Sequence, residues 1–396
     1  MRILHTSDWH LGRSFHGVDM LEAQAAYVDH LLATVASERV DLVLVSGDVY
    51  DRALPPVRAV ELADEALARL AASGATTIVT SGNHDSHIRL GANARLVAHA
   101  GVHLRTRWAD VAAPVLLDDA HGTVAVYPLP YLEPDAVLSA WQLPVRSHES
   151  ALTAAMGRVR ADLESRAGVR SVVLAHAFVA GSLDAAPAMS SASERDISVG
   201  GLQVVPTAVF EGIDYVALGH LHRPQTLADA VRYSGSPLAY SFSEAGHVKG
   251  SWLVDLGPGG EVDATFVPAP VPRRLATLTG RLDDLLTDPA HAADEDAWVQ
   301  AVLTDRIRPQ HAMDRLRARF PHTLALDFQP EGGRVMHAPS LPHVTGRSDL
   351  DVALGFVADV RNLEATTEEA LLLQLACDSC RPDRDADPVP SPARAG

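Results

Sequence analysis

The stretch SGNHDSH, residues 81–87, follows GATTIVT, a β-branched run that is typical of a buried strand. An amide, an imidazole and a carboxylate, those of Asn83, His84 and Asp85, therefore stand in a row just past the end of a core strand. A simple turn would account for Gly82, Asn83 and Asp85, but it has little need of a histidine. Comparable polar clusters after other strands would indicate a shared site.

Four further clusters show the same pattern of an apolar strand, a small residue or turn, and then oxygen or imidazole groups. They lie in SDWH (Asp8, His10), SGDVYD (Asp48, Asp51), VVLAHA (His176) and ALGHLH (His220, His222). In layered α/β sheets, sites form at the C-terminal ends of strands, so groups far apart in sequence can converge. A lone Asp after a strand is usually a helix cap or a turn former. Five clusters in order argue against coincidence.

Alternating strands and helices predict the fold class of the first part of the chain. Residues 20–38 have the periodicity of an amphipathic helix, and PPVRAVELADEALARLAASG has proline at its start and glycine at its end, as helix termini prefer. The predicted strands are RILHTS, DLVLVSGD, TTIVTSGNHD, VAVYPLP, SVVLAHA, YVALGHLH, VRYSGS and SWLVDL. We therefore expect an α/β layered domain over residues 1–265.

The remainder of the chain predicts smaller units. FVPAPVPRR, residues 266–274, is rich in proline and indicates a linker. AWVQAVLTD, PQHAMDRLRARF and HTLALDF predict a small β-α-β unit within a capping domain over residues 274–345. Residues 348–376 have helical periodicity and predict a helical segment, whereas the polar, proline-rich residues 378–396 predict a disordered tail.

Composition limits the class of protein. The chain has 396 residues, a net charge of −17 and no apolar run or signal peptide that would indicate a membrane or secreted protein, so we expect a soluble cytoplasmic protein. The charge argues against a protein that coats DNA, but not against an enzyme that meets nucleic acid at one metal-loaded groove. Lys249 is the single lysine among many arginines. Cys377 and Cys380 form one C-x-x-C without a second pair for zinc, and predict an incidental feature of the tail.

The side chains at the strand ends indicate the chemistry. Two aspartates, four histidines and one asparagine, with no thiol, suit manganese, iron or zinc in a catalytic role. Seven donors exceed what one ion normally takes from a protein, whereas two ions that share a carboxylate would use them all. Two dications bring a charge of about +4 and Asp8 and Asp48 return −2, so the remainder favours an anionic phosphodiester and two-metal hydrolysis.

The motifs D-x-H, GD-x-x-D, GNHD, a lone His and GH-x-H, in this order, resemble those of the calcineurin-like metallophosphoesterases. Within that superfamily, the chain resembles the SbcD-type nuclease subunits, relatives of the Mre-type double-strand-break nucleases. The stretches that carry this resemblance are MRILHTSDWHLG, VSGDVYD, VTSGNHDS, SERDISVGG (193–201), YVALGHLHRPQ (215–225) and VRYSGSPLAYSFSE (231–244). It covers about residues 1–255 and is architectural only beyond residue 270. It implies a metallophosphoesterase β-sandwich flanked by helices.

The resemblance also assigns roles to residues. It implies that one ion is held by Asp8, His10, Asp48 and His222, and the other by Asp48, Asn83, His176 and His220, with Asp48 bridging. It implies a catalytic role for His84 near the scissile phosphate, and a supporting or turn-forming role for Asp85. Archaeal and eukaryotic relatives carry a histidine at the position of Asp51, and the aspartate follows the bacterial pattern. The role of Asp51 as a second catalytic group or a contact for substrate therefore stays open.

Four other residues near the motifs have two interpretations. Arg89 and Arg223 are candidate contacts for the DNA backbone, and the alternative is a solvated or salt-bridged arginine. His5 lies inside the first strand and predicts packing rather than metal ligation. His87 predicts a surface turn rather than a contact with substrate.

The leading functional hypothesis is a Mn²⁺-dependent DNA nuclease subunit for DNA repair, recombination and replication. The resemblance implies exonuclease action on duplex ends, endonuclease action on single strands or hairpins, and an SbcC-type coiled-coil ATPase as partner. Residues 348–376 would dock on that coiled coil or pack on the capping domain, and the chain would form a homodimer within a heterotetramer. The alternatives are a dinuclear phosphatase or phosphodiesterase for nucleotides or phosphoproteins, and a non-catalytic regulator of the ATPase. The intact ligand set argues against the regulator.

Overall fold

The computed structural model describes residues 1–181, 191, 194, 204–331, 348–361 and 364–379. The chain divides into two compact units. The first comprises Met1–Thr277, Ala292–Gln300 and Phe320–Ala325, and the second comprises the remaining segments. None of the described helices is both long enough and apolar enough to cross a membrane.

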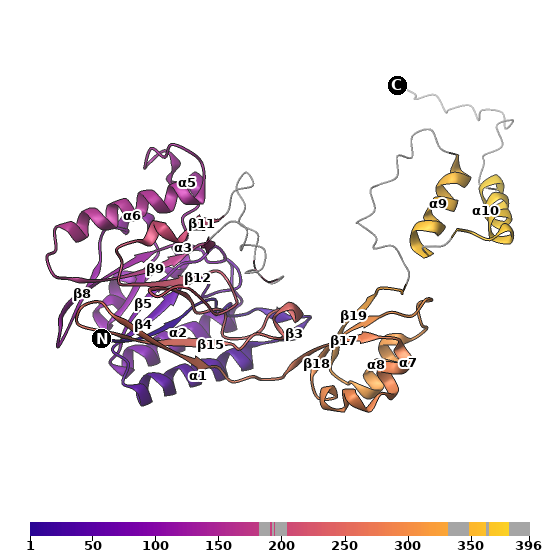
Figure 1. The fold of residues 1–396 in the computed structure, drawn as a ribbon, viewed down its shortest axis with the longest axis horizontal. Coiled ribbons are helices and arrows are strands. Elements are labelled where there is room, and N and C mark those ends of the chain that lie inside the picture. Colours follow the sequence, from indigo (N-terminus) through magenta and orange to yellow (C-terminus); the bar gives the residue numbers. More distant parts are fainter. Residues whose placement is uncertain (182–190, 192–193, 195–203, 332–347, 362–363, 380–396) are drawn as a thin grey trace, which may run out of the picture. The chain divides into compact units, whose positions relative to one another are not determined.

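Two six-stranded sheets form the frame of the first unit (Figure 1). The order in the first sheet is β16 (Val262–Pro268), β15 (Gly250–Leu256), β1 (Arg2–Thr6), β4 (Leu42–Ser46), β5 (Thr76–Thr80) and β6 (Val102–Arg105). The order in the second is β13 (Gln225–Ala228), β14 (Val231–Tyr233), β12 (Tyr215–Gly219), β9 (Arg170–His176), β8 (Gly122–Leu129) and β7 (Val115–Asp119). The strands β1, β4, β5 and β6 are parallel neighbours, as are β8, β9 and β12.

The two sheets pack face to face because their strands are apolar on both faces. Leu42 and Leu44 of β4 belong to the same buried cluster as Val172 and Leu174 of β9, whereas the alternate residue Val43 packs in a different cluster. This alternation follows from the two-residue period of a strand. The predicted layered α/β sandwich is therefore confirmed.

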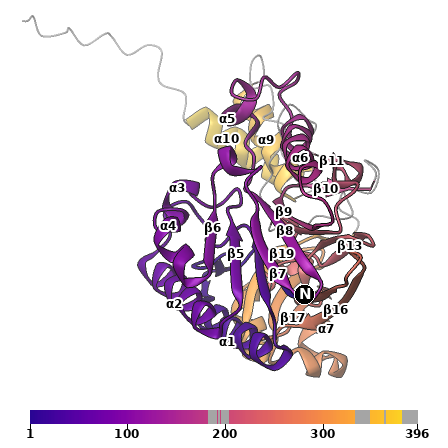
Figure 2. The ribbon, with the colours of Figure 1, turned by 90° about the vertical axis from the view of Figure 1, so that its left-hand side faces the viewer.

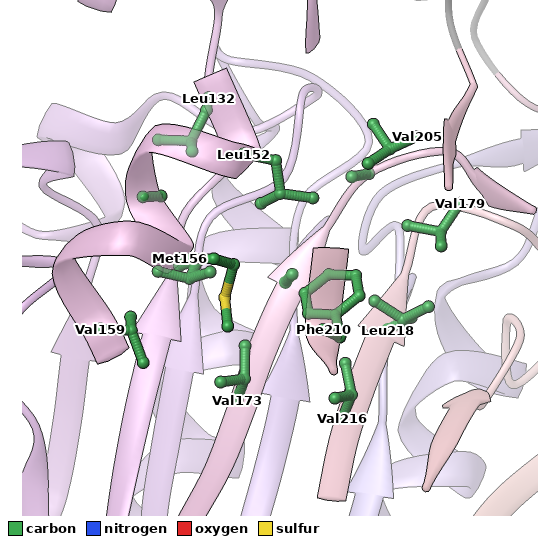
Figure 3. Close-up of a cluster of buried hydrophobic side chains, with 14 of the residues drawn as sticks. Leu132, Leu152, Met156, Val159, Val173, Val179, Val205, Phe210, Val216 and Leu218 are labelled. Atoms are coloured by element: carbon green, nitrogen blue, oxygen red, sulfur yellow. The ribbon is translucent and has the colours of Figure 1, made fainter. Parts of the chain in front are cut away.

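Helices cover the outer faces of both sheets. The helices α1 (Leu21–Glu38) and α2 (Val57–Ser73) lie side by side along the outer face of the first sheet (Figure 2). On the second sheet, Met156 of α6 (His148–Glu164) points toward Val173 of β9, and Phe210 lies beside Val216 of β12 (Figure 3). The predicted helix signals are confirmed at α2, which begins after Pro56 and ends at Gly74 in the left-handed conformation.

Short elements complete the first unit. They are β2 (Ser14–Phe15), β3 (Val18–Asp19), α3 (His87–Leu90), α4 (Ala94–Val97), α5 (Pro134–Leu138), β10 (Val179–Ala180) and β11 (Val205–Pro206), together with single 3-10 turns at Ala98–Ala100, Trp108–Asp110, Thr207–Phe210 and Phe242–Glu244. The strands β2 and β3 form a hairpin, and β10 pairs with β11.

The predicted β-α-β pattern is present after residue 274 as β18 (Trp298–Leu303), α8 (Ala312–Arg319) and β19 (Thr323–Phe328). They are preceded in the chain by β17 (Leu275–Gly280), α7 (Leu282–Thr287) and a 3-10 turn at Pro289–Asp294. The three strands form a sheet in the order β17-β18-β19. Residues 332–345 of the predicted capping domain lie outside the described residues.

Three boundaries differ from the predictions. The strand β16 extends to Pro268, so the first residues of the predicted linker belong to a sheet edge, where proline is tolerated. The segment 348–376 forms two helices, α9 (Asp349–Arg361) and α10 (Thr367–Ser379). Cys377 and the first residues of the predicted tail belong to α10, while Cys380 and the rest of the tail lie outside the described residues.

Candidate metal centre

The predicted site residues lie at the C-terminal ends of strands from both sheets. The strand ends are β1 for Asp8 and His10, β4 for Asp48 and Asp51, β5 for Asn83 and His84, β9 for His176, and β12 for His220 and His222. The two sheets meet at this edge, since the backbone amide of His220 donates to Asp8 Oδ1 at 3.1 Å. The predicted convergence is therefore what the structure shows.

The backbone at this edge is strained. The φ angles are 54° at Asp8, 46° at His10, 51° at Asp48 and 105° at His220, in a region that residues other than glycine rarely adopt. Cross-strand hydrogen bonds hold the strained loops: the amide of Asp8 donates to the carbonyl of Gly47 at 3.0 Å, and that of His10 to the carbonyl of Asp48 at 3.0 Å. Such strain persists where the surrounding structure imposes it, typically at functional sites.

Two glycines give the carboxylate and imidazole groups room to approach. A Cβ atom at Gly82 would lie 2.1 Å from Asp48 Oδ1, and one at Gly47 would lie 2.4 Å from His176 Nδ1. Gly47 also has a φ of 91°. The Ser-Gly that precedes the polar residues in two of the clusters thus has a steric cause.

One half of the site gathers around the amide oxygen of Asn83. Asn83 Oδ1 lies 2.9 Å from His176 Nε2 and 3.3 Å from His220 Nδ1. His176 Nδ1 donates to the carbonyl of Ser46 at 2.9 Å, which directs Nε2 into the site. Asp48 Oδ2 lies 3.4 Å from the same Nε2. An amide oxygen, a carboxylate oxygen and two ring nitrogens therefore converge here.

The other half contains Asp8, His10 and His222, whose ligand atoms all lie within 4.8 Å of one another. His10 Nε2 is 3.0 Å from His222 Nε2 and 3.7 Å from Asp48 Oδ2. The ligand atoms of Asp8, Asp48 and His176 also lie within 4.8 Å of one another. Asp48 thus contacts both halves, as a bridging carboxylate must.

The charges of these side chains suit divalent cations. Burial opposes the imidazolium of His176, yet Asp48 and Asp8 outweigh it and raise the pKa of that ring to about 9. Burial lowers the pKa of His10 and of His220 well below the usual range, so both rings are neutral. The cluster therefore stabilises a positive charge, which a metal ion would supply in place of the His176 proton. Imidazoles, an amide oxygen and carboxylates form a donor set that fits a pair of ions such as Mn²⁺, Fe²⁺ or Zn²⁺.

His84 is held beside the donor atoms by its backbone and by one ring nitrogen. Its amide donates to Asp48 Oδ1 at 2.9 Å, and its Nδ1 lies 2.6 Å from the carbonyl oxygen of Asp51. Because a carbonyl only accepts, Nδ1 carries the proton and Nε2 is the atom available for proton exchange. The ring stands edge-on to His10 with centroids 4.7 Å apart and is half-buried, so a substrate can approach it.

Asp85 supports the loops rather than the donor set. Its carboxylate accepts from the amides of Val49 at 3.1 Å, Tyr50 at 2.9 Å and Gly82 at 3.0 Å. These three hydrogen bonds connect the loop after β4 to the loop after β5. The geometry agrees with the supporting, turn-forming role expected for Asp85.

Asp51 contacts the site through its backbone carbonyl rather than through its carboxylate. Asp51 Oδ1 is 3.8 Å from His10 Nδ1 and 3.6 Å from Arg13 Nη1. Both distances exceed a hydrogen bond. In this structure Asp51 reaches His84 through its carbonyl.

The outlying residues have the following places. Arg89 on α3 and Arg223 after His222 are exposed, and their contact with DNA stays a prediction. His5 is buried, with Nδ1 2.9 Å from the hydroxyl of Tyr215, as expected for a packed histidine. His87 is exposed at the start of α3.

Three charged residues to which no motif assigned a role also reach the centre. Glu244 Oε1 lies 3.2 Å from His222 Nδ1, and Lys249 Nζ lies 2.6 Å from Glu244 Oε2. Glu194 Oε1 accepts from the backbone amide of His222 at 2.6 Å. Glu194 and Glu244 fall within stretches that carry the family resemblance, and Lys249 is the single lysine of the sequence. Their place in these stretches and the rarity of lysine were the features of the sequence that could have indicated these three residues.

Comparisons with known proteins identify two family models in the chain. Residues 1–224 match the family model of the calcineurin-like phosphoesterases. Residues 271–361 match the model described as the type 5 capsule protein repressor C-terminal domain (SbcD_C).

Similar solved structures include a protein of Thermus thermophilus, at 14% identity and a TM-score of 0.38, covering 67% of this chain and 98% of that one. A dimetal phosphatase from Danio rerio has 12% identity and a TM-score of 0.38, covering 68% and 99%. An archaeal phosphodiesterase has 10% identity and a TM-score of 0.29, covering 67% and 100%.

Proposed function

The chain belongs to the calcineurin-like phosphoesterase family, a family of metal-dependent phosphoester hydrolases, and we propose that it is a Mn²⁺-dependent DNA nuclease. The observation that supports this proposal is the combination of an Asp/His cluster that could hold metal ions with a C-terminal match to the SbcD_C model at residues 271–361. A phosphatase for small substrates needs the former alone. The proposed reactions are exonuclease action on duplex ends and endonuclease action on single strands or hairpins.

The two halves of the site would each hold one ion. Asp8, His10, Asp48 and His222 would hold the first, and Asp48, Asn83, His176 and His220 the second. Bound there, two divalent ions supply Lewis acidity and lower the pKa of a water for in-line attack on a phosphodiester. Asn83 contributes an oxygen without charge, which leaves the site positive and suited to an anionic backbone.

His84 would act on the leaving group. Its Nδ1–H donates to the carbonyl of Asp51 at 2.6 Å, which leaves Nε2, on the other side of the ring, to exchange a proton. A protonated Nε2 would donate to the oxygen that leaves when the phosphodiester bond breaks. The edge-on contact with His10 keeps the ring beside the donor atoms.

We propose that an SbcC-type coiled-coil ATPase binds the helices α9 and α10, and that the chain forms a homodimer within a heterotetramer. Exposed apolar side chains support a partner there, since Phe356 of α9 and Leu371 and Leu372 of α10 are each more than 60% exposed. A partner that supplies much of the DNA-binding surface would also explain how a chain of net charge −17 acts on DNA.

Cleavage of end-labelled linear duplex DNA with Mn²⁺ tests the proposal. Wild type, His84→Ser and the control His87→Ser would be compared, with and without the ATPase, beside a small phosphodiester substrate. We expect His84→Ser to lose about 10²- to 10⁴-fold in cleavage rate, as for loss of a general acid, while still binding two Mn²⁺ ions. His87→Ser, whose histidine is exposed three residues on, should cleave like wild type.

Two results would contradict the proposal. If DNA survives in every reaction while the small phosphodiester is hydrolysed, the hydrolase stands and the substrate is wrong. If His84→Ser loses a metal ion, its histidine is a ligand rather than the acid.

A further inference from the structure

His222 is held at three of its polar groups by charged side chains. Its Nδ1 lies 3.2 Å from Glu244 Oε1, its carbonyl accepts from Lys249 Nζ at 2.8 Å, and its amide donates to Glu194 at 2.6 Å. The fourth group, Nε2, lies 3.0 Å from His10 Nε2. The direction and tautomer of this ring are therefore determined by its surroundings, with Nδ1–H toward the carboxylate and Nε2 toward the site.

Lys249 is placed where a compact ammonium is needed. It is the single lysine among 33 basic residues, and only 7% of it is exposed. Its Nζ contacts Glu244 Oε2 at 2.6 Å, the carbonyl of His222 at 2.8 Å and Ser236 Oγ at 2.9 Å. Three acceptors match the three N–H bonds of an ammonium, whereas a planar guanidinium presents five in a fixed fork. This match gives a physical reason for a lysine in a chain that otherwise uses arginine.

Secondary structure keeps the pair in register with the site. Glu244 ends the 3-10 turn at Phe242–Glu244, and its Oε2 also accepts from the amide of Tyr240 at 3.1 Å. Lys249 immediately precedes β15, and its carbonyl accepts from the amide of Ala269 at 2.7 Å. Both residues are thus anchored to rigid backbone rather than to an open loop.

We propose that Glu244 and Lys249 are positioning residues for one metal ion only: Glu244 orients His222 Nε2, and Lys249 holds Glu244 and the backbone of His222 in place. The inference rests on the two-ion site of the proposed function but not on its substrate. The other ion is independent of the pair, because His176 is oriented by the carbonyl of Ser46, which no side-chain substitution removes. A carboxylate behind a ligating histidine is worth about 10- to 100-fold in metal affinity.

Mn²⁺ binding to the full-length chain tests this inference. Glu244→Gln removes one charge and keeps the side-chain length, and Lys249→Met removes one charge and shortens the side chain by one atom. Arg170→Met is the matched control, because it removes a buried cation from the ion pair with Asp119 at the opposite end of β9. Stoichiometry and affinity would be measured by calorimetry, and the electron paramagnetic resonance spectrum would report whether two Mn²⁺ ions are coupled or one is isolated.

We expect Glu244→Gln and Lys249→Met to bind one Mn²⁺ as wild type does and the second about 10- to 100-fold more weakly, with the spectrum of an isolated ion at intermediate concentrations. Arg170→Met should bind two coupled ions despite a lower melting temperature. Ser236→Ala, which removes one neutral partner of Lys249, should shift the same ion by less and covers the case in which a charge variant fails to fold. Wild-type affinity for both ions in the two charge variants, or equal weakening of both ions, would overturn the proposal. Neither result depends on whether DNA is cleaved.

Discussion

The two ends of β9 carry buried charged residues of opposite character. At the start of the strand, Arg170 Nη2 lies 2.5 Å from Asp119 Oδ1, and Asp119 Oδ2 lies 2.9 Å from the ammonium of Met1. At its end, His176 faces the carboxylates of Asp48 and Asp8. In the first group each carboxylate oxygen has a cationic partner, so its charges are paired. In the second group two carboxylates lie near the single ring of His176.

The difference separates stability from function. Paired charges at the start of β9 follow the usual rule for buried ions, where a partner offsets the cost of desolvation. The carboxylate of Asp8 at this end remains costly in the folded chain: burial, followed by the proximity of Asp48, raises its pKa to about 7, whereas, despite burial, the neighbouring imidazoles hold the pKa of Asp48 well below its usual range. A protein keeps such an arrangement where a ligand completes it. Substitutions at the two ends should therefore affect different properties.

The largest effect is expected for Asp48→Asn, at the functional end. Asp48 contacts both halves of the site, so loss of its charge should weaken both ions. We expect hydrolysis of a small phosphodiester to fall by at least about 10³-fold, because metal ions contribute several kcal/mol of transition-state stabilisation. The melting temperature of the metal-free protein should fall only modestly: the attraction of the neighbouring imidazoles, His176 first, is lost, and despite burial it holds the pKa of Asp48 well below its usual range, but the cost of burying this charge is lost with it.

Metal content, phosphodiester hydrolysis and melting temperature of Asp48→Asn would be measured together. A variant that keeps two tightly bound ions would show that Asp48 is not the bridge. A metal-free variant that unfolds far more readily than wild type would show that this end of the strand also serves stability, and the contrast would fail.

The next effect is expected for Asp119→Asn, at the structural end. Leaving Arg170 without its charged partner should cost about 3 kcal/mol of folding free energy, as for a broken buried pair. Hydrolysis and metal affinity should stay at the wild-type level. The Arg170 hydrogen bond lowers the pKa of Asp119 in the folded state. A depressed carboxylate pKa stabilises the fold above the unfolded value of about 4, and that contribution is lost as the pH falls below it.

The difference in melting temperature between wild type and Asp119→Asn should thus be full at pH 7 and shrink toward pH 3. The melting temperature at several pH values, with the metal removed, measures it. A difference that persists unchanged at pH 3 would show that the ion pair is not its source.

The strand ends could be predicted because their polar groups follow apolar runs directly. Asn83 and His176 needed no tertiary information, since a parallel strand brings its own end to the site. Glu244 and Lys249 could not be found this way, because they lie in a turn and at the start of a strand, and only the folded chain shows them behind His222. The linker predicted over residues 266–274 was placed too early for a related reason. A proline-rich stretch has the composition of a linker, and only the folded chain shows that Pro268 lies in an edge strand.

The smallest effect is expected for Asp51→Asn, which probes how His84 is held. The contact to His84 Nδ1 comes from the carbonyl of residue 51, which asparagine retains. The carboxylate lies 3.8 Å from His10 Nδ1 and 3.6 Å from Arg13 Nη1, so its loss removes weak electrostatic contacts rather than a hydrogen bond.

We expect Asp51→Asn to lower the rate of phosphodiester hydrolysis by less than about 10-fold, well short of the loss in His84→Ser. The rate under saturating Mn²⁺ and its pH profile would be compared for the two variants. A loss as large as that of His84→Ser would mean that the Asp51 carboxylate itself exchanges a proton or holds the substrate. The metal centre would then contain a catalytic carboxylate beside His84, and its contrast with the paired charges around Arg170 would become sharper still.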